Sequence, residues 1–121
     1  MTAPNERLIV IRHAPHSSNS LREGLDTALV AAAFGQQVSL LFMGQGVFAL
    51  LKDQTVGAPG QKATLPTIDM LEMYDINQLF IPVESLKTLN INASMLVEKV
   101  TLLPSEELPS LFNRYSHILN F

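Results

Sequence analysis

Residues 11–26 read Ile-Arg-His-Ala-Pro-His-Ser-Ser-Asn-Ser-Leu-Arg-Glu-Gly-Leu-Asp, and residues 42–51 read Phe-Met-Gly-Gln-Gly-Val-Phe-Ala-Leu-Leu. Each stretch opens on the last residue of a mainly apolar run, residues 8–11 in the first case and residues 37–42 in the second. Short runs of this kind, rich in β-branched and large apolar side chains, indicate strands buried on both faces of a parallel sheet. A polar loop or turn therefore follows each strand at its carboxyl end, which is where binding sites of open α/β sheets lie.

Local signals also predict the helices that follow these two strands. Ser20 and Glu23 have the spacing of a capping box, so we expect Ser20 to be the N-cap of a helix. Gly35 supplies a left-handed residue that ends this helix. After the second strand, Gly44 and Gly46 predict a tight turn into a short helix.

The rest of the chain continues the alternation of strands and helices. We expect further strands at residues 79–81, within residues 95–103 and within residues 115–121. Residues 52–63 are predicted to form a loop. The whole pattern predicts one domain over residues 1–121, with an α/β fold: a flavodoxin-like, three-layer α/β/α sandwich around a mostly parallel, five-stranded sheet. The order of the strands in that sheet does not follow from the sequence.

The composition excludes several classes of protein. The chain has 121 residues, no cysteine and a net charge of −3, which excludes disulfides, thiolate metal sites, a cysteine nucleophile and a broad basic surface for nucleic acid. No apolar run reaches the roughly 18 residues of a membrane span, and no signal-peptide block is present, so we expect a cytoplasmic protein. Charged residues make up 16% of the chain, against about 25% in a typical soluble domain. This shortfall favours a surface partly covered by another subunit.

The polar loop after the first strand is a candidate anion or nucleotide site. Its candidate residues are His13, His16, Ser17, Ser18 and Ser20, which precede or begin a helix whose free amide groups attract anions. The expected capping role of Ser20 accounts for that residue without any ligand. His13 and His16 alone do not make a metal site, because no cysteine or carboxylate nearby supplies the remaining ligands, and we predict none.

Several short blocks, spread over nearly the whole chain, have the order and spacing of one known family. They are Ala14-Pro-His16, Arg22-Glu-Gly-Leu-Asp26, Phe42-x-Gly-x-Gly-Val-Phe48 with Leu50-Leu51, Leu71, Tyr74-Asp-Ile76, Ser85-Leu86 and Tyr115-x-x-Ile-Leu-x-Phe121. Together they resemble the DsrE/DsrF-like sulfur-relay superfamily and, within it, the TusC/DsrF branch. Separated blocks in register are far more specific than any one of them.

The resemblance implies a flavodoxin-like fold and a set of paralogous partners. TusC/DsrF-like, TusD/DsrE-like and TusB/DsrH-like subunits form a heterotrimer that pairs into a hexamer. The relay passes persulfide sulfur toward 2-thiouridine at the tRNA wobble position in the Tus branch, or serves sulfur oxidation in the Dsr branch. The relay cysteine belongs to the TusD/DsrE-like subunit, at the end of its third strand, and no cofactor is implied.

At the corresponding place this chain carries Pro82, whereas members of the branch can carry a cysteine there. Proline has no thiol, so persulfide chemistry at this position is impossible and we predict no catalytic residue in the chain. A second departure is Gln45, because an acidic residue is common between the two glycines in the family.

The sequence therefore predicts a non-catalytic subunit of a sulfurtransferase complex, which supports persulfide transfer by a cysteine-bearing paralogue and has only an indirect link to tRNA. The alternatives are a DsrF-type subunit in sulfur oxidation, a stand-alone homo-oligomer, and a small anion- or nucleotide-binding protein that uses residues 13–20. Candidate interface residues lie at the glycine turn and on the predicted helix before the third strand: Gly44, Gly46, Val47, Phe48, Met70, Met73 and Tyr74.

Overall fold

The computed structural model describes residues 6–15, 19–51 and 65–121. Its strands are β1 (Glu6–Ile11), β2 (Gln37–Phe42), β3 (Leu79–Pro82), β4 (Val100–Leu103) and β5 (His117–Asn120). Its α-helices are α1 (Ser20–Ala33), α2 (Leu65–Met73), α3 (Val83–Thr88) and α4 (Leu108–Asn113). Three short 3₁₀-helices complete it: η1 (Gly44–Leu50), η2 (Ala93–Met95) and η3 (Ser105–Glu107). The loop predicted at residues 52–63 lies outside the described residues.

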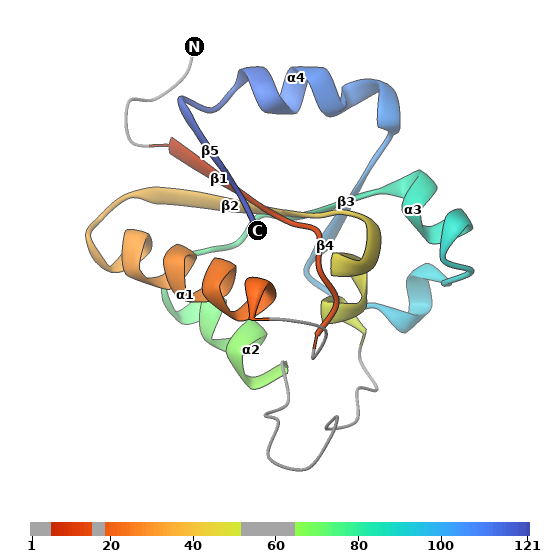
Figure 1. Cartoon of the computed structure of the whole chain (residues 1–121), viewed down its shortest axis with the longest axis horizontal. Coiled ribbons are helices and arrows are strands. Elements are labelled where there is room, and N and C mark those ends of the chain that lie inside the picture. The colour runs from red at the N-terminus through yellow and green to blue at the C-terminus, as the bar shows by residue number, and fades with distance from the viewer. Residues whose placement is uncertain (1–5, 16–18, 52–64) are drawn as a thin grey trace.

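The five strands form one sheet in the order β4-β3-β2-β1-β5, and every neighbouring pair is parallel. Helices α1 and α2 cover one face of this sheet, and α4 covers the other (Figure 1). The predicted α/β fold with a parallel five-stranded sheet is therefore confirmed. The flavodoxin sheet has the order 2-1-3-4-5, so the present chain shares its layered architecture but not its order of strands.

Two apolar clusters, one on each face, hold the layers together. On the face of α1 and α2, Ile9, Leu40 and Ile81 pack with helix residues such as Leu25 and Leu71. On the face of α4, Leu8, Val10, Leu41 and Phe80 pack against Leu111 and Tyr115. Successive residues of a strand point to opposite faces, so a strand buried on both sides must be apolar throughout. This requirement explains the uninterrupted apolar run of residues 8–11.

The predicted capping box at the start of α1 is wrong. The N-cap is Asn19, whose carbonyl oxygen accepts a hydrogen bond from the amide of Glu23 at 2.9 Å and whose side chain makes no capping bond. Ser20 is instead the first residue within the helix. A capping side chain acts from an extended residue, whereas Asn19 already has helical backbone angles, with φ −82° and ψ −2°. The predicted stop is confirmed, because Gly35 has a φ of +84°.

The last strand is tied to the first by backbone hydrogen bonds that continue to Phe121. The Phe121 amide donates to the carbonyl of Val10, and the Arg12 amide donates to the carbonyl of Phe121, both at 2.8 Å. The Phe121 side chain then packs on α1 at Gly24, where a β-carbon would lie 3.2 Å from the ring. The missing side chain of Gly24 therefore makes room for this aromatic residue.

Candidate functional site

The carboxyl-terminal edge of the sheet, where the sequence placed its candidate residues, is built around η1. The Met43 amide donates to the Ile11 carbonyl at 2.9 Å, and the Gly46 amide donates to the Met43 carbonyl at the same distance. These bonds fold η1 back over the end of β1. A β-carbon at Gly46 would lie 2.2 Å from the Ile11 carbonyl oxygen, so only glycine allows this approach.

A small hollow of about 230 Å³ opens at this edge beside the end of β3. It is lined by Met43, Gly44, Pro82, Glu84, Ser85, Thr88, Leu89, Ser105 and Leu108. The lining offers hydroxyl groups and one carboxylate but no thiol, imidazole or cationic group, and the Thr88 hydroxyl already donates to the Glu84 carbonyl at 3.2 Å. Nothing in this lining supplies an activated nucleophile.

Pro82 is the buried last residue of β3 and the N-cap of α3. It stands opposite Leu103 in the register of β3 with β4. The structure thus places Pro82 at the end of a strand and beside the hollow, and its ring carries no reactive group.

The candidate anion loop is only partly placed. His13 is exposed just after β1, and Ser20 begins α1; His16, Ser17 and Ser18 lie outside the described residues. Near His13, the Arg12 guanidinium donates to the side-chain oxygen of Asn120 at 3.3 Å. Among the described residues, no three histidine or acidic side chains are close enough together to hold a metal ion.

The candidate interface residues fall into two groups. Gly46 and Val47 are buried inside this chain, and Phe48 is half-buried against the core, so they hold η1 on the sheet. Gly44 is exposed at the turn, with a φ of +50°. Met70, Met73 and Tyr74 are exposed at α2, and 82% of the Met73 surface is accessible.

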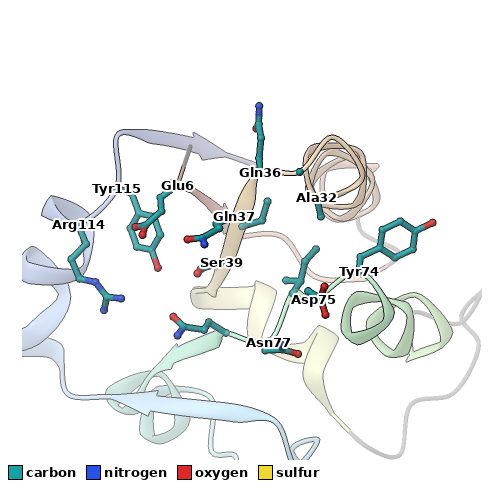
Figure 2. A pocket seen from close by; sticks show the side chains of 14 residues that line it. Glu6, Ala32, Gln36, Gln37, Ser39, Tyr74, Asp75, Asn77, Arg114 and Tyr115 are labelled. Carbon is teal, nitrogen blue, oxygen red and sulfur yellow. The ribbon is translucent and has the colours of Figure 1, made fainter. Parts of the chain in front are cut away.

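A second cavity, of about 480 Å³, lies at the opposite, amino-terminal edge of the sheet, and the sequence reasoning missed it (Figure 2). Its polar lining includes Glu6, Gln37, Ser39, Arg114 and Tyr115. The available signal was Ser39, the one polar residue among the five buried residues of β2. The candidate residues predicted from the sequence lie instead toward the carboxyl ends of the strands, where ligands of α/β sheets usually bind.

Comparison with known proteins places this chain in a family. The model of the DsrE/DsrF-like family matches residues 6–121. This chain belongs to the DsrE/DsrF-like family. The resemblance drawn from the short blocks of sequence is therefore confirmed.

Within this family the chain is TusC-like. It is 33% identical over 113 residues to Protein TusC of Klebsiella pneumoniae strain 342, an alignment that covers 93% of this chain and 95% of that protein. It is 34% identical over 114 residues to a TusC homologue of Pasteurella multocida, with 93% and 96% covered. A TusC homologue of Vibrio vulnificus strain CMCP6 is 30% identical over 112 residues, with 93% and 95% covered.

A solved structure of the YchN protein from E. coli shares the fold. The two structures align with a TM-score of 0.84 over 97% of this chain and 99% of YchN, at 20% sequence identity. This likeness bears on the fold alone. In the part of the DsrE/DsrF-like chain that the structure describes, no helix is long and apolar enough to cross a membrane.

Proposed function

We propose that this chain is a non-catalytic, cytoplasmic subunit of a sulfurtransferase complex that works in 2-thiolation of the tRNA wobble uridine. In this role the whole of residues 1–121 acts as one TusC-type domain. Its partners are TusD/DsrE-like and TusB/DsrH-like paralogues, in a heterotrimer that pairs into a hexamer. A cysteine of a paralogous subunit carries the persulfide.

The observation that carries this proposal is a TusC-like sequence that has no cysteine. The likeness to TusC proteins extends over 93% of the chain, while the sequence contains no thiol at any position. A persulfide needs a sulfur atom on the carrier protein. Pro82 is buried, and the hollow beside it has no reactive group; both observations support a structural, non-catalytic role for this chain.

An exposed apolar patch supports the need for partners. We define the α1–α2 patch by five exposed residues. They are Val30 in α1, Phe34 at the C-cap of α1, Met70 and Met73 in α2, and Tyr74 directly after α2. Phe34 and Met73 are 81% and 82% exposed, and both helices cover the same face of the sheet (Figure 1). Large apolar side chains gathered on one surface mark interaction sites in soluble proteins. We therefore assign the α1–α2 patch to contact with a paralogous subunit.

Co-expression tests the proposal directly. The chain is produced together with the TusD-like and TusB-like chains of its own genome, and the intact mass of the purified assembly is measured. We expect an assembly that contains all three chains in equal amounts. A chain that elutes alone at its monomer mass, in the presence of both paralogues, would refute the proposed role.

Reconstituted thiolation then distinguishes the pathways. We expect sulfur transfer to tRNA to require this chain together with the cysteine of a paralogue, and to be lost when either is omitted. A complete assembly that does not thiolate tRNA would favour the DsrF-type role in sulfur oxidation. Turnover by the isolated chain would contradict the non-catalytic role.

A further inference from the structure

The cavity at the amino-terminal edge is built differently from the carboxyl edge, and it shares Tyr74 with the α1–α2 patch. Its volume of about 480 Å³ lies within the range of roughly 300–1,000 Å³ that small-molecule sites occupy. It is formed by the starts of β1 and β2, the end of α1 with the turn that follows it, the segment between α2 and β3, and the residues that follow α4. All the residues that line it are among those described.

The length of α4 explains why this part of the sheet is open. The helix has six residues and covers the part of its face where Leu8, Val10 and Leu41 lie. Closer to the starts of the strands, the same face of the sheet carries Ser39, Glu6 and Gln37. Ser39 lies opposite Leu8 in the register of β1 with β2, and Glu6 lies opposite Gln37. Polar side chains therefore replace apolar ones where the helix no longer covers the sheet.

Ser39 indicates that this polar surface is more than a solvated edge. The residue is only 7% exposed, and its hydroxyl makes no hydrogen bond to any other residue that the structure describes. No side-chain oxygen or nitrogen among these residues is both sealed from solvent and unpartnered, so the hydroxyl reaches the cavity. A hydroxyl that opens into the cavity from a nearly buried residue can donate and accept hydrogen bonds there, and a ligand in the cavity can take the place of the solvent that bonds it.

Two opposite charges face the same cavity without meeting. Arg114 comes from the end of α4 and Glu6 from the start of β1, and neither forms an ion pair within the described residues (Figure 2). The Arg114 guanidinium lies 5.7 Å from the centre of the Tyr115 ring, which holds it over the cavity wall. Gln37 and Ser39, which line the same cavity to one side of these two charges, offer an amide and a hydroxyl.

We propose that this cavity binds a small zwitterion of the α-amino-acid class. The ligand carboxylate pairs with Arg114, its ammonium group pairs with Glu6, and its polar side chain bonds to Ser39 and Gln37. A ligand that is only anionic would meet repulsion from Glu6 and from Asp75, which also lines the cavity, and a ligand that is only cationic would leave the Arg114 guanidinium without a partner. A zwitterion satisfies both charges at once.

Titration of the full chain with L-glutamine tests this proposal, with backbone amide resonances and calorimetry as the measurements. We expect saturable shifts at Gln37, Ser39 and Arg114. Glutaramate lacks the ammonium group and 4-aminobutanamide lacks the carboxylate, so each is expected to bind about tenfold more weakly, because each loses one charge-assisted hydrogen bond. Absence of saturable shifts, or equal binding of the analogues, would overturn the proposal.

Variants of the cavity give an independent test. Arg114→Gln and Glu6→Gln are expected to weaken L-glutamine binding about tenfold, and Ser39→Ala several-fold. The matched controls Arg22→Gln and Glu106→Gln change exposed charges outside the cavity and should bind as the unmodified chain does. Thermal unfolding confirms that each variant is folded. Unchanged binding by Arg114→Gln would refute the assignment, and since the test uses this chain alone, it is independent of the proposed assembly.

Discussion

Gly46 lies directly over the carbonyl oxygen of Ile11, and a β-carbon at position 46 would stand 2.2 Å from that oxygen. The nearest atoms to this β-carbon belong to the backbone of Ile11, so the clash cannot be relieved by the movement of a flexible side chain. We therefore expect Gly46→Ala to lower the free energy of unfolding by about 3 kcal/mol, the upper range for overpacking. Urea denaturation measures the change. Gln45→Ala, at the exposed neighbouring position, is the control and should leave stability nearly unaltered; a tolerated Gly46→Ala would show that η1 does not pack as described.

The contact of Gly24 with Phe121 predicts a different result for a glycine within a helix. Replacing an exposed helical glycine with alanine usually stabilises by about 1 kcal/mol. Here the added β-carbon would lie 3.2 Å from the Phe121 ring, so we expect Gly24→Ala to give no such gain. In a Phe121→Ala background the same change should stabilise more than it does in the unmodified chain. A double-mutant cycle on thermal unfolding measures this coupling, and additive effects would contradict it.

Charge in the α1–α2 patch is expected to prevent assembly. Met73 is 82% exposed, so Met73→Glu should leave the unfolding of the isolated chain within about 0.5 kcal/mol of its original value. In the complex, by contrast, the carboxylate would be desolvated against an apolar partner. We expect co-purification of the paralogues to fall at least tenfold, because burying an unpaired charge is costly. Met95→Glu, on η2 and 47% exposed, is the matched control outside the patch. Equal assembly of both variants would place the interface elsewhere.

Pro82→Cys tests whether a thiol at the end of β3 is sufficient for sulfur transfer. The backbone at this position has φ −62° and ψ 129°, which cysteine adopts readily. The hollow beside it contains no cation or imidazole that would activate a thiol. In a complex whose paralogue has lost its own relay cysteine, we expect Pro82→Cys not to restore sulfur transfer. Labelled sulfur in the product tRNA is the readout, and restored labelling would mean that position 82 remains competent.

The surface ion pair of Lys99 with Glu72 should contribute little to stability. Their side chains are 50% and 58% exposed, and exposed pairs typically contribute about 0–1 kcal/mol. We expect Glu72→Ala to change the free energy of unfolding by less than about 0.5 kcal/mol at moderate ionic strength. A larger loss in denaturant titration would indicate that the pair holds α2 against the segment before β4.

Local signals in the sequence predicted much of the fold, because buried parallel strands must be apolar throughout. The run at residues 8–11 and the left-handed stop at Gly35 were assigned correctly, and Gly35 has a positive φ value. The order of the strands in the sheet could not be predicted from the sequence, because it depends on which apolar surfaces of distant segments pack together. The N-cap of α1 was misplaced by one residue, because several consecutive polar residues offer equivalent capping groups.

The sites were harder to predict than the elements. Pro82 and Met73 could be proposed from the sequence because a missing thiol and an apolar helix position are recognisable from the order of residues alone. The amino-terminal cavity was not found, because Ser39 and Arg114 are far apart in the sequence and become neighbours only when α4 returns across the sheet. Helix α4 is too short to cover the starts of the strands. This depends on how the layers pack, and no local sequence pattern reveals it.

The place of β5 in the sheet has a consequence for how the protein is made. Strand β1 pairs with β2 on one side and with β5 on the other, and the Ser116 hydroxyl bonds to the Glu6 carbonyl across 110 positions of sequence. While the polypeptide is being synthesised, one side of β1 has no neighbour until residues 117–120 have left the ribosome. Pairings this distant slow folding, and nascent fragments that stop before residue 117 would present β1 as an open strand to any chaperone or aggregating chain nearby.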